Sequence, residues 1–450
     1  MKILSRSAVE RLGWTTGSYA VGQGFRLVNN VILARLLAPE LFGIMLIVNT
    51  LRTGVELLSD IGIGQNIISN KNGENPEFYN TAWTLQIIRG FLLSIICLLS
   101  AYPISMIYKS QTIYQIIPVI SSIFIFTGMS SISRNIAQKR LNLKVLGIYD
   151  IYVNASSLII HVVCAIITPT IWALVYGGVL SSIFSMAGGF FLISGVKYRL
   201  ILSRKYVFEI ISFGKWILLS TIVYFLSMNF DRLFIAKSLP FQILGIYGVA
   251  RSLADVLSQL VARIGGLVIF PMVAAAGHSK EILKEKLSLS RTSMLTGLAV
   301  VVSLFVSSSD LIVLLLYDDR YKAAALMLPV LAVGVWFSAL CTLSESVLLG
   351  MGRPAYGAIA NVIKFVWLLI GLPLAIAFYG VAGAVGVMAA SEFVRYLPLL
   401  HYQKVEQISF LRQDILITIA MFAMVVVWRT LFWSLGFSGG IQSLWGLNQL

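Results

Sequence analysis

Charged side chains recur every four residues at two places in an otherwise apolar chain. The first series consists of Arg52, Glu56 and Asp60. The second consists of Arg251, Asp255, Gln259 and Arg263. Four-residue spacing places side chains on one face of a helix. Arginine is well suited to phosphate, because its planar guanidinium group binds two oxygens and stays charged. Both faces are therefore candidates for binding an anionic, phosphate-bearing ligand.

Other polar residues extend these candidates. Gln23, Arg26 and Asn30 share a face of the first expected helix, and Tyr224, Ser227, Asp231 and Arg232 lie together on the seventh. Ionisable groups inside a membrane cost several kcal/mol and normally face a cavity or a partner. We expect a hydrated central cavity whose substrate-binding residues are Arg26, Asn30, Arg52, Arg89, Arg251 and Arg263. The candidate ion-coupling residues are Glu56, Asp60, Asp255 and Glu345, with Glu392 as a further proton or cation site.

A structural interpretation of the same residues stays open. Arg52 with Glu56, and Arg251 with Asp255, could be ion pairs that neutralise each other between helices. Arg134, Lys364 and Arg395 lie near the ends of expected helices and are interpreted as anchors whose charged groups reach the membrane interface. His161 stands alone in its helix and is expected to be a packed residue.

Composition decides the class of protein. The chain has 450 residues, of which 58% are hydrophobic and only 12% are charged, about half the charged fraction of ordinary soluble proteins. A helix needs about 20 apolar residues to cross a bilayer, and such runs fill most of this chain. A membrane β-barrel would show alternating rather than continuous apolar runs. We therefore expect an all-α, polytopic membrane protein.

Thirteen membrane helices are expected, joined by short loops. They are 13–36, 41–68, 79–105, 112–134, 147–168, 171–194, 210–237, 241–270, 291–316, 322–348, 357–379, 380–402 and 412–436. Residues 1–11 are expected to form a short interfacial helix, and the tail 438–450 is too short to span a membrane. The loops leave no room for a large extramembrane domain.

The net charge of +15 is explained by the loops. Lysine and arginine cluster in alternate loops, at 134–144, 197–205, 280–291, 353 and 404–412. Such an excess marks cytoplasmic loops. We therefore expect a cytoplasmic N-terminus and an outward C-terminal tail, and no nucleic-acid partner.

A helical hairpin recurs about 200 residues along the chain. Asn29–Arg52 and Asp231–Leu253 each read as the end of an apolar helix, a Pro-containing turn and the start of another helix. Six expected spans precede the basic connector 196–208, so the second half enters the membrane in the same direction as the first. We expect two parallel six-helix repeats, 1–200 and 201–405, or twelve core helices, followed by about one extra helix in 406–450.

Catalytic and metal-binding motifs are not found. The sequence holds no GxxxxGK, HExxH or CxxC pattern. Its three cysteines, Cys97, Cys164 and Cys341, lie inside apolar runs, where thiols are usually packing residues. We expect a protein that is not an enzyme and has neither cofactor nor metal.

Three segments resemble a known family: ARLLAPELFGI, LSDIGIGQNII (Leu58–Ile68) and LGMGRPAYGAIANVIK (Leu349–Lys364). They are similar to the polysaccharide-transporter, or O-antigen flippase, branch of the multidrug/oligosaccharidyl-lipid/polysaccharide exporter superfamily, over roughly residues 5–405. The resemblance implies that polyprenyl-pyrophosphate-linked oligosaccharides are moved from the cytoplasmic to the periplasmic leaflet of a bacterial inner membrane without ATP. A polysaccharide polymerase and a chain-length regulator are the partners it implies. By similarity to lipid II flippases, Arg26, Arg52 and Arg251 would bind the pyrophosphate.

Two other functions remain in competition. One is a cation-coupled multidrug exporter of the same superfamily, whose cavity should be acidic and aromatic. The other, of a different class, is an integral-membrane polysaccharide polymerase or glycosyltransferase, against which the short loops argue. The drive also stays open between H⁺ or Na⁺ coupling and the membrane potential acting on the charged substrate.

Overall fold

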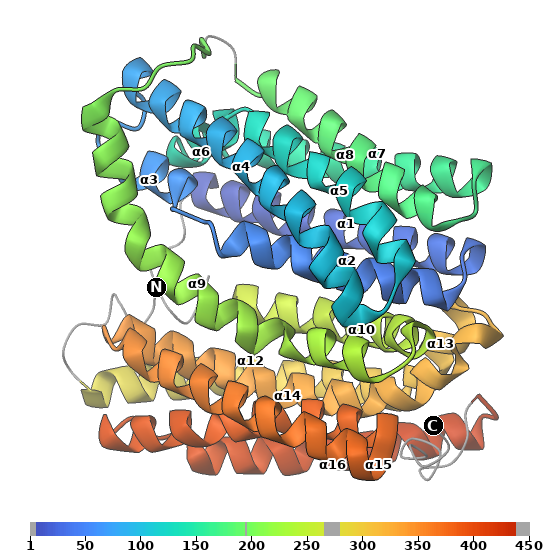
Figure 1. Cartoon of the computed structure of the whole chain (residues 1–450). Coiled ribbons are helices and arrows are strands. Elements are labelled where there is room, and N and C mark those ends of the chain that lie inside the picture. Colours follow the sequence, from blue (N-terminus) through green and yellow to red (C-terminus); the bar gives the residue numbers. More distant parts are fainter. Residues whose placement is uncertain (1–5, 194–195, 265–279, 438–450) are drawn as a thin grey trace. The chain divides into compact units, whose positions relative to one another are not determined.

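The computed structural model describes residues 6–193, 196–264 and 280–437, and within these ranges every regular element is a helix (Figure 1). The chain divides into two compact units, Met1–Phe225 and Leu226–Leu450. The expected all-α class is confirmed. The tail 438–450, the end of the expected helix 241–270, and the side chains of Tyr224, Arg263 and residues 6–13 lie outside the described part of the chain.

The first unit is built from eight described helices and the start of a ninth. They are α1 (Arg6–Leu36), α2 (Pro39–Leu57), α3 (Ile63–Ser69), α4 (Pro76–Tyr108), α5 (Gln111–Met129), α6 (Ser133–Lys139), α7 (Leu143–Ile167), α8 (Ile171–Phe190) and α9 (Arg204–Ser238). α4 packs on α5, and α7 packs on both α1 and α8. A Cβ atom on Gly90 would lie 2.5 Å from the Phe124 carbonyl oxygen, so α4 and α5 touch through backbone, as small residues allow in membranes.

The second unit contains the end of α9 and the remaining described α-helices. These are α10 (Phe241–Ile264), α12 (Lys280–Ser307), α13 (Ser309–Leu316), α14 (Lys322–Gly350), α15 (Pro354–Val405) and α16 (Leu411–Ser434). α15 is two helical legs joined at Gly380, whose φ of 58° is not helical, and the expected boundary between 357–379 and 380–402 falls there. The expected single helix 291–316 is wrong, because α12 and α13 are bent by 59°.

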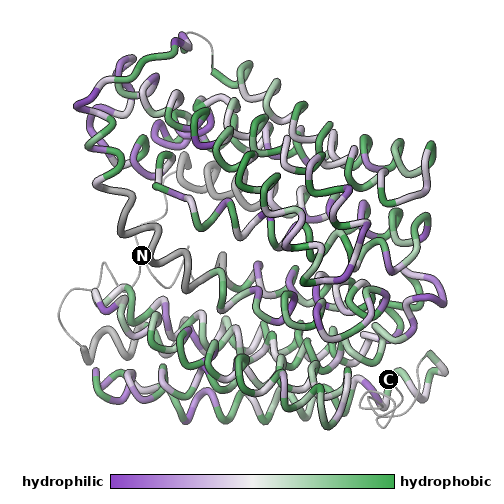
Figure 2. The backbone as a smooth tube through the Cα atoms, in the orientation of Figure 1, coloured by the Kyte–Doolittle hydropathy of each residue, from purple (hydrophilic) through white to green (hydrophobic). Residues whose placement is uncertain are grey.

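Seven described helices are long and apolar enough to cross a membrane, or eight if the bent pair counts as one span. Figure 2 shows apolar residues along most of their length. The helices that carry the charged faces, α1, α2 and α10, are not among these seven. Polar residues interrupt their apolar runs and lower their mean hydropathy. The chain is a multi-pass membrane protein.

The repeated hairpin is confirmed within each unit. α1 ends at Leu36 and α2 begins at Pro39, while α9 ends at Ser238 and α10 begins at Phe241. Each turn is thus two residues long. The helix ends on both sides of the second turn are separated from those of the first by the same number of residues. The buried positions also correspond: Leu33 with Ile235, Ala34 with Ala236, Ile44 with Ile246, Ile47 with Val249, and Val48 with Ala250.

The expected helix 41–68 is wrong, because the chain breaks between α2 and α3. Gly62 adopts a left-handed conformation with φ of 64°, which glycine reaches without steric cost. The Asp60 carboxylate accepts a hydrogen bond from the Gly62 backbone N–H at 2.9 Å, the local bonding by which aspartate competes with a helix. Asp60 therefore does not continue the face of Arg52 and Glu56. The expected helix 112–134 is likewise divided, into α5 and α6.

The connector between the halves is held along α4 before α9 begins. Residues 196–203 are not helical, and their backbone N–H groups donate to α4 side chains. The pairs are Arg199 with Asn80 at 2.8 Å, Ile201 with Thr84 at 3.0 Å and Ser203 with Thr81 at 3.2 Å. The first turns of α9 bury Tyr206 and Ile210 in a core cluster of the first unit. The polar start of α4 thus fixes the direction in which α9 leaves.

Candidate functional site: the arginine-bearing helix faces

In the first unit, the charged face of α2 consists of Arg52 and Glu56. Their Nη1 and Oε2 atoms are 3.4 Å apart, and both side chains are half-buried. Ile44 and Val48, which precede Arg52 at the same four-residue spacing, are buried, and so is Ile47. The i,i+4 pair weighed as a structural alternative is therefore present, but it is long and open to its surroundings.

In the second unit, two arginines converge on Asp255. Arg251 Nε lies 3.0 Å from one carboxylate oxygen and Arg232 Nη2, from α9, lies 3.1 Å from the other. Asp231 is buried nearby and accepts a hydrogen bond from the Tyr247 hydroxyl at 2.5 Å. The α10 face is thus a mixed network of arginines and acids, and Arg232 joins it although it was not among the expected substrate-binding residues.

The α1 residues lie in a different environment. Arg26 is exposed, and its Nε donates to the Asn154 side-chain oxygen on α7 at 3.1 Å. Asn30, one turn later, is half-buried. Gln23 is buried and donates to the Tyr19 hydroxyl at 2.7 Å. Arg26 is the only charged residue of the three and is also the most exposed.

Arg89 has a local structural task at the end of α2. Its Nη2 donates to the Glu56 backbone carbonyl at 2.6 Å and its Nε to the Ser59 hydroxyl at 3.1 Å. A helix that stops inside a membrane exposes carbonyl groups that neighbouring side chains must satisfy. Arg89 meets this need at the α2–α3 break, and it borders an apolar groove lined by Leu85, Ile88 and Leu92 among others.

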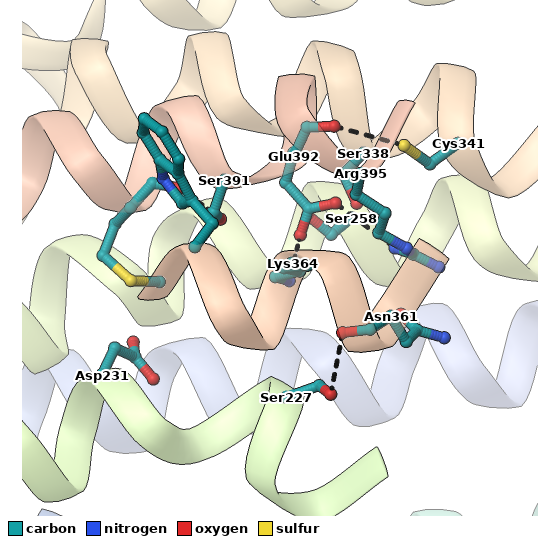
Figure 3. A network of polar contacts seen from close by, with 12 residues as sticks. Ser227, Asp231, Ser258, Ser338, Cys341, Asn361, Lys364, Ser391, Glu392 and Arg395 are labelled. Carbon is teal, nitrogen blue, oxygen red and sulfur yellow. Dashed lines mark hydrogen bonds and ion pairs between the residues drawn. The ribbon is translucent and has the colours of Figure 1, made fainter. Parts of the chain in front are cut away.

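Lys364 and Arg395 are not interfacial anchors, so that prediction is wrong. Both are buried in the second unit, where they meet Glu392 (Figure 3). Arg395 also meets Glu345. Their positions near the expected helix ends suggested an anchor role. Instead, both are buried, and acidic partners on α14 and α15 compensate their charge. His161 is packed as expected: it contacts Gly177 and shares a hydrogen bond with the Ser157 carbonyl at 2.8 Å.

Two buried ion pairs tie α16 to the second unit, and sequence reasoning missed both. Arg291 lies 2.5 Å from Asp414, and Arg429 lies 2.6 Å from Asp310. The partners are 123 and 119 residues apart in the chain, so no local spacing announced them. Arg291 was expected in the basic loop 280–291, and this expectation is wrong, because Arg291 is buried within α12.

The loops carry an exposed pair of a different kind. Arg140 lies 2.7 Å from Glu74, both side chains being about half exposed. The hydrogen bond from Arg140 lowers the pKa of the Glu74 carboxyl below its ordinary value. Among the described residues, no group of three or more His, Cys, Asp or Glu side chains could hold a metal ion.

A family model described as "Polysaccharide biosynthesis protein" matches residues 32–326. The chain belongs to this family of polysaccharide biosynthesis proteins. Curated relatives include the teichuronic acid biosynthesis protein TuaB of Bacillus subtilis (24% identical, covering 66% of this chain and 62% of TuaB). Others are the succinoglycan biosynthesis transport protein ExoT of Rhizobium meliloti (20%, covering 81% and 72%) and the lipopolysaccharide biosynthesis protein WzxC of Escherichia coli (22%, covering 62% and 57%). The chain thus spans about six tenths of the length of TuaB and WzxC.

Solved structures show the fold of this polysaccharide biosynthesis protein. The lipid II flippase MurJ, in an inward closed conformation, is similar with a TM-score of 0.76 at 12% identity, covering 97% of this chain and 95% of MurJ. An inward-facing multidrug resistance transporter of the MATE family and MOP superfamily is similar with a TM-score of 0.61 at 13% identity, covering 88% and 94%. The expected family resemblance and the expected fold class are confirmed.

Proposed function

We propose that this chain is a flippase that moves polyprenyl-pyrophosphate-linked oligosaccharide units from the cytoplasmic to the periplasmic leaflet of a bacterial inner membrane. Membership of the polysaccharide biosynthesis family and the names of its curated relatives support a role in polysaccharide production. The fold shared with a lipid II flippase supports a lipid-linked substrate. The products in view are O-antigen, capsule or exopolysaccharide.

The proposal rests on one observation: each of the two equivalent helices, α2 and α10, carries a partly exposed arginine. Arg52 on α2 and Arg251 on α10 are half-buried and engage carboxylates on only part of their guanidinium groups. Arg26 on α1 is exposed. Partly free guanidinium groups can exchange a carboxylate for a pyrophosphate oxygen, which they bind with charge-assisted hydrogen bonds. Arg26, Arg52 and Arg251 are our candidates for the pyrophosphate, with Asn30 for a neighbouring sugar.

Alternating access moves the headgroup while the prenyl chain stays in lipid. A pyrophosphate diester carries about two negative charges. A potential of 100 mV, negative inside, favours outward movement by roughly 2.3 kcal/mol per charge. H⁺ or Na⁺ coupling through Glu56, Asp60, Asp255 or Glu345 is the alternative drive. Three of these carboxylates face arginines and Asp60 binds a backbone N–H, so we favour the potential.

The location follows from the same proposal. A cytoplasmic N-terminus places the basic loops 134–144 and 197–205 on the side of the anionic inner leaflet. There the flippase receives a substrate assembled by glycosyltransferases. On the opposite side it hands the unit to a polymerase and its chain-length regulator, and it catalyses no covalent step itself.

Reconstitution into liposomes tests the function. The purified chain should make a fluorescent polyprenyl-pyrophosphate oligosaccharide accessible to a membrane-impermeant quencher much faster than empty liposomes do. The rate should rise when an imposed membrane potential is negative on the side from which the anionic headgroup starts. A chain that moves cationic drugs and leaves this lipid in place would instead be a multidrug exporter, the function that the MATE-like fold keeps in view.

A further inference from the structure

Four charged side chains of the second unit form one connected network, and Figure 3 shows three of them, Lys364, Glu392 and Arg395. Glu392 Oε1 lies 2.5 Å from Lys364 Nζ, and Glu392 Oε2 lies 3.3 Å from Arg395 Nη1. Arg395 Nη2 lies 2.5 Å from Glu345 Oε2. Lys364 is on the first leg of α15, Glu392 and Arg395 are on its second leg, and Glu345 is on α14. The network therefore joins three helical segments through charge-assisted hydrogen bonds.

The charges of these four side chains sum to zero, and the central carboxylate is fully engaged. The Lys364 side chain is 2% exposed and the Glu392 side chain 10% exposed. Hard cations bind proteins through oxygen ligands, and here each Glu392 oxygen faces a cationic side chain. Lysine suits this position, because its ammonium group is a compact point charge with three donors on a flexible stem.

The network also lies close to a candidate headgroup-binding residue. Arg251 on α10 interacts electrostatically with Glu392, and α10 packs on α14. The charge carried at Glu392 therefore influences the field at Arg251. An ion that entered and left at Glu392 would alter this field in every cycle, whereas a lysine fixed to the chain keeps it constant.

We propose that the Lys364 ammonium group is a built-in counter-cation of Glu392, so that this carboxylate takes no ion from solution. Lys364 occupies the place at Glu392 Oε1 where a free cation would otherwise bind. The inference deepens the proposed function, on which its meaning for transport rests: it removes Glu392 from the possible coupling sites and so favours the membrane potential as the drive.

Binding of radioactive Na⁺ to the purified full chain tests this without any transport measurement. Lys364→Met removes the charge with little change of volume, and Lys364→Arg retains it. Lys364→Met should bind one more Na⁺ per chain than the wild type, saturably and in competition with unlabelled Na⁺. The double variant Lys364→Met/Glu392→Gln and the Lys364→Arg variant should bind as the wild type does.

Two results would overturn the inference. One is equal Na⁺ binding by the wild type and by Lys364→Met, with Lys364→Gln as the replacement if the methionine variant does not fold. The other is a loss of Na⁺ binding when Glu392→Gln is made in the wild-type background, which would show that Glu392 already holds an ion. Because the readout is binding, failure here leaves the flipping result unaffected, and failure to flip leaves this result unaffected.

Discussion

The arginines of α2 and α10 differ sharply from those that hold α16. Arg52 and Arg251 side chains are 24% and 20% exposed, whereas those of Arg291 and Arg429 are 1% and 0% exposed. Arg291 gives two hydrogen bonds to the Asp414 carboxylate, at 2.5 and 3.1 Å. Arg52 gives Glu56 a single bond of 3.4 Å. Arginine in these helices thus occurs in two environments, which differ in exposure and in hydrogen bonding.

The two buried ion pairs of α16, here called the sealed pairs, explain how this extra helix is held in place. Arg291 on α12 meets Asp414 near the start of α16, and Arg429 near the end of α16 meets Asp310 on α13. α16 supplies the acid of one pair and the arginine of the other, so a reversed α16 would bring like charges together and a shifted α16 would separate both pairs. α16 is therefore fixed in depth and direction, while the arginines of α2 and α10 stay partly exposed.

The largest effect should come from breaking a sealed pair. Arg291→Ala leaves Asp414 charged and buried, which costs about 3–5 kcal/mol. We expect a large loss of folded protein and a lower Tm in detergent. Arg134→Ala, which breaks the exposed pair with Asp150, is the matched control and should change stability by about 0–1 kcal/mol. An unchanged Tm for Arg291→Ala would remove the distinction between the two kinds of arginine.

Removing an accessible arginine should affect transport rather than stability. Arg251→Ala loses charge-assisted hydrogen bonds to the headgroup, worth about 1.5–3 kcal/mol, so flipping should fall roughly 10- to 100-fold at a nearly unchanged Tm. Arg251→Lys keeps the charge without the planar fork and should lie between the two. Flipping and thermal unfolding measured on the same preparations decide this. A fall in Tm as large as that of Arg291→Ala would place Arg251 with the sealed arginines.

Arg89 should behave as an intermediate case. Arg89→Ala leaves the Glu56 carbonyl without its donor, which costs about 1–3 kcal/mol for a buried group. We expect a moderate loss of stability and local opening of the α2–α3 break, seen as faster hydrogen exchange at residues 57–63. Exchange unchanged there, together with loss of headgroup binding, would show that Arg89 serves the substrate instead.

The smallest effect belongs to the exposed pair of Glu74 and Arg140. Because this pair lowers the pKa of Glu74 in the folded state, its stabilisation is present above the unfolded pKa of about 4.3 and is lost as pH falls through the lower folded value. Comparison of Tm at pH 7 and at pH 3 for the wild type and Glu74→Gln should show a slightly smaller drop in the variant. A larger drop in Glu74→Gln would contradict the assigned sign.

Much of the fold was predictable, because it depends on patterns along the chain. Apolar runs predicted the long helices, and the recurring hairpin predicted a tight turn in each half, which the structure places at Leu37–Ala38 and Leu239–Pro240. The break after α2 was missed, since helical spacing of Arg52, Glu56 and Asp60 continued across it. Spacing alone did not reveal the Asp60–Gly62 turn or the Arg89 bonds that stabilise the break.

The candidate site was less predictable. Helical periodicity shows which residues share a helix face, but it does not show which other residues pack against that face. Lys364 and Arg395 were interpreted as anchors from their positions near helix ends, yet their partners Glu392 and Glu345 make them part of a buried network. The pairs Arg291–Asp414 and Arg429–Asp310 join residues far apart in sequence. Only the packed structure distinguishes these sealed arginines from the accessible ones.

Binding of the headgroup is the most direct test of the central claim. The affinity of the purified chain for a polyprenyl pyrophosphate should be measured for the wild type, Arg26→Ala, Arg52→Ala, Arg251→Ala and the Arg134→Ala control. The account predicts affinity at least about 10-fold weaker for each of the first three variants, as expected for lost charge-assisted bonds, and unchanged affinity for the control. Wild-type affinity in all three variants, at normal Tm, would contradict it.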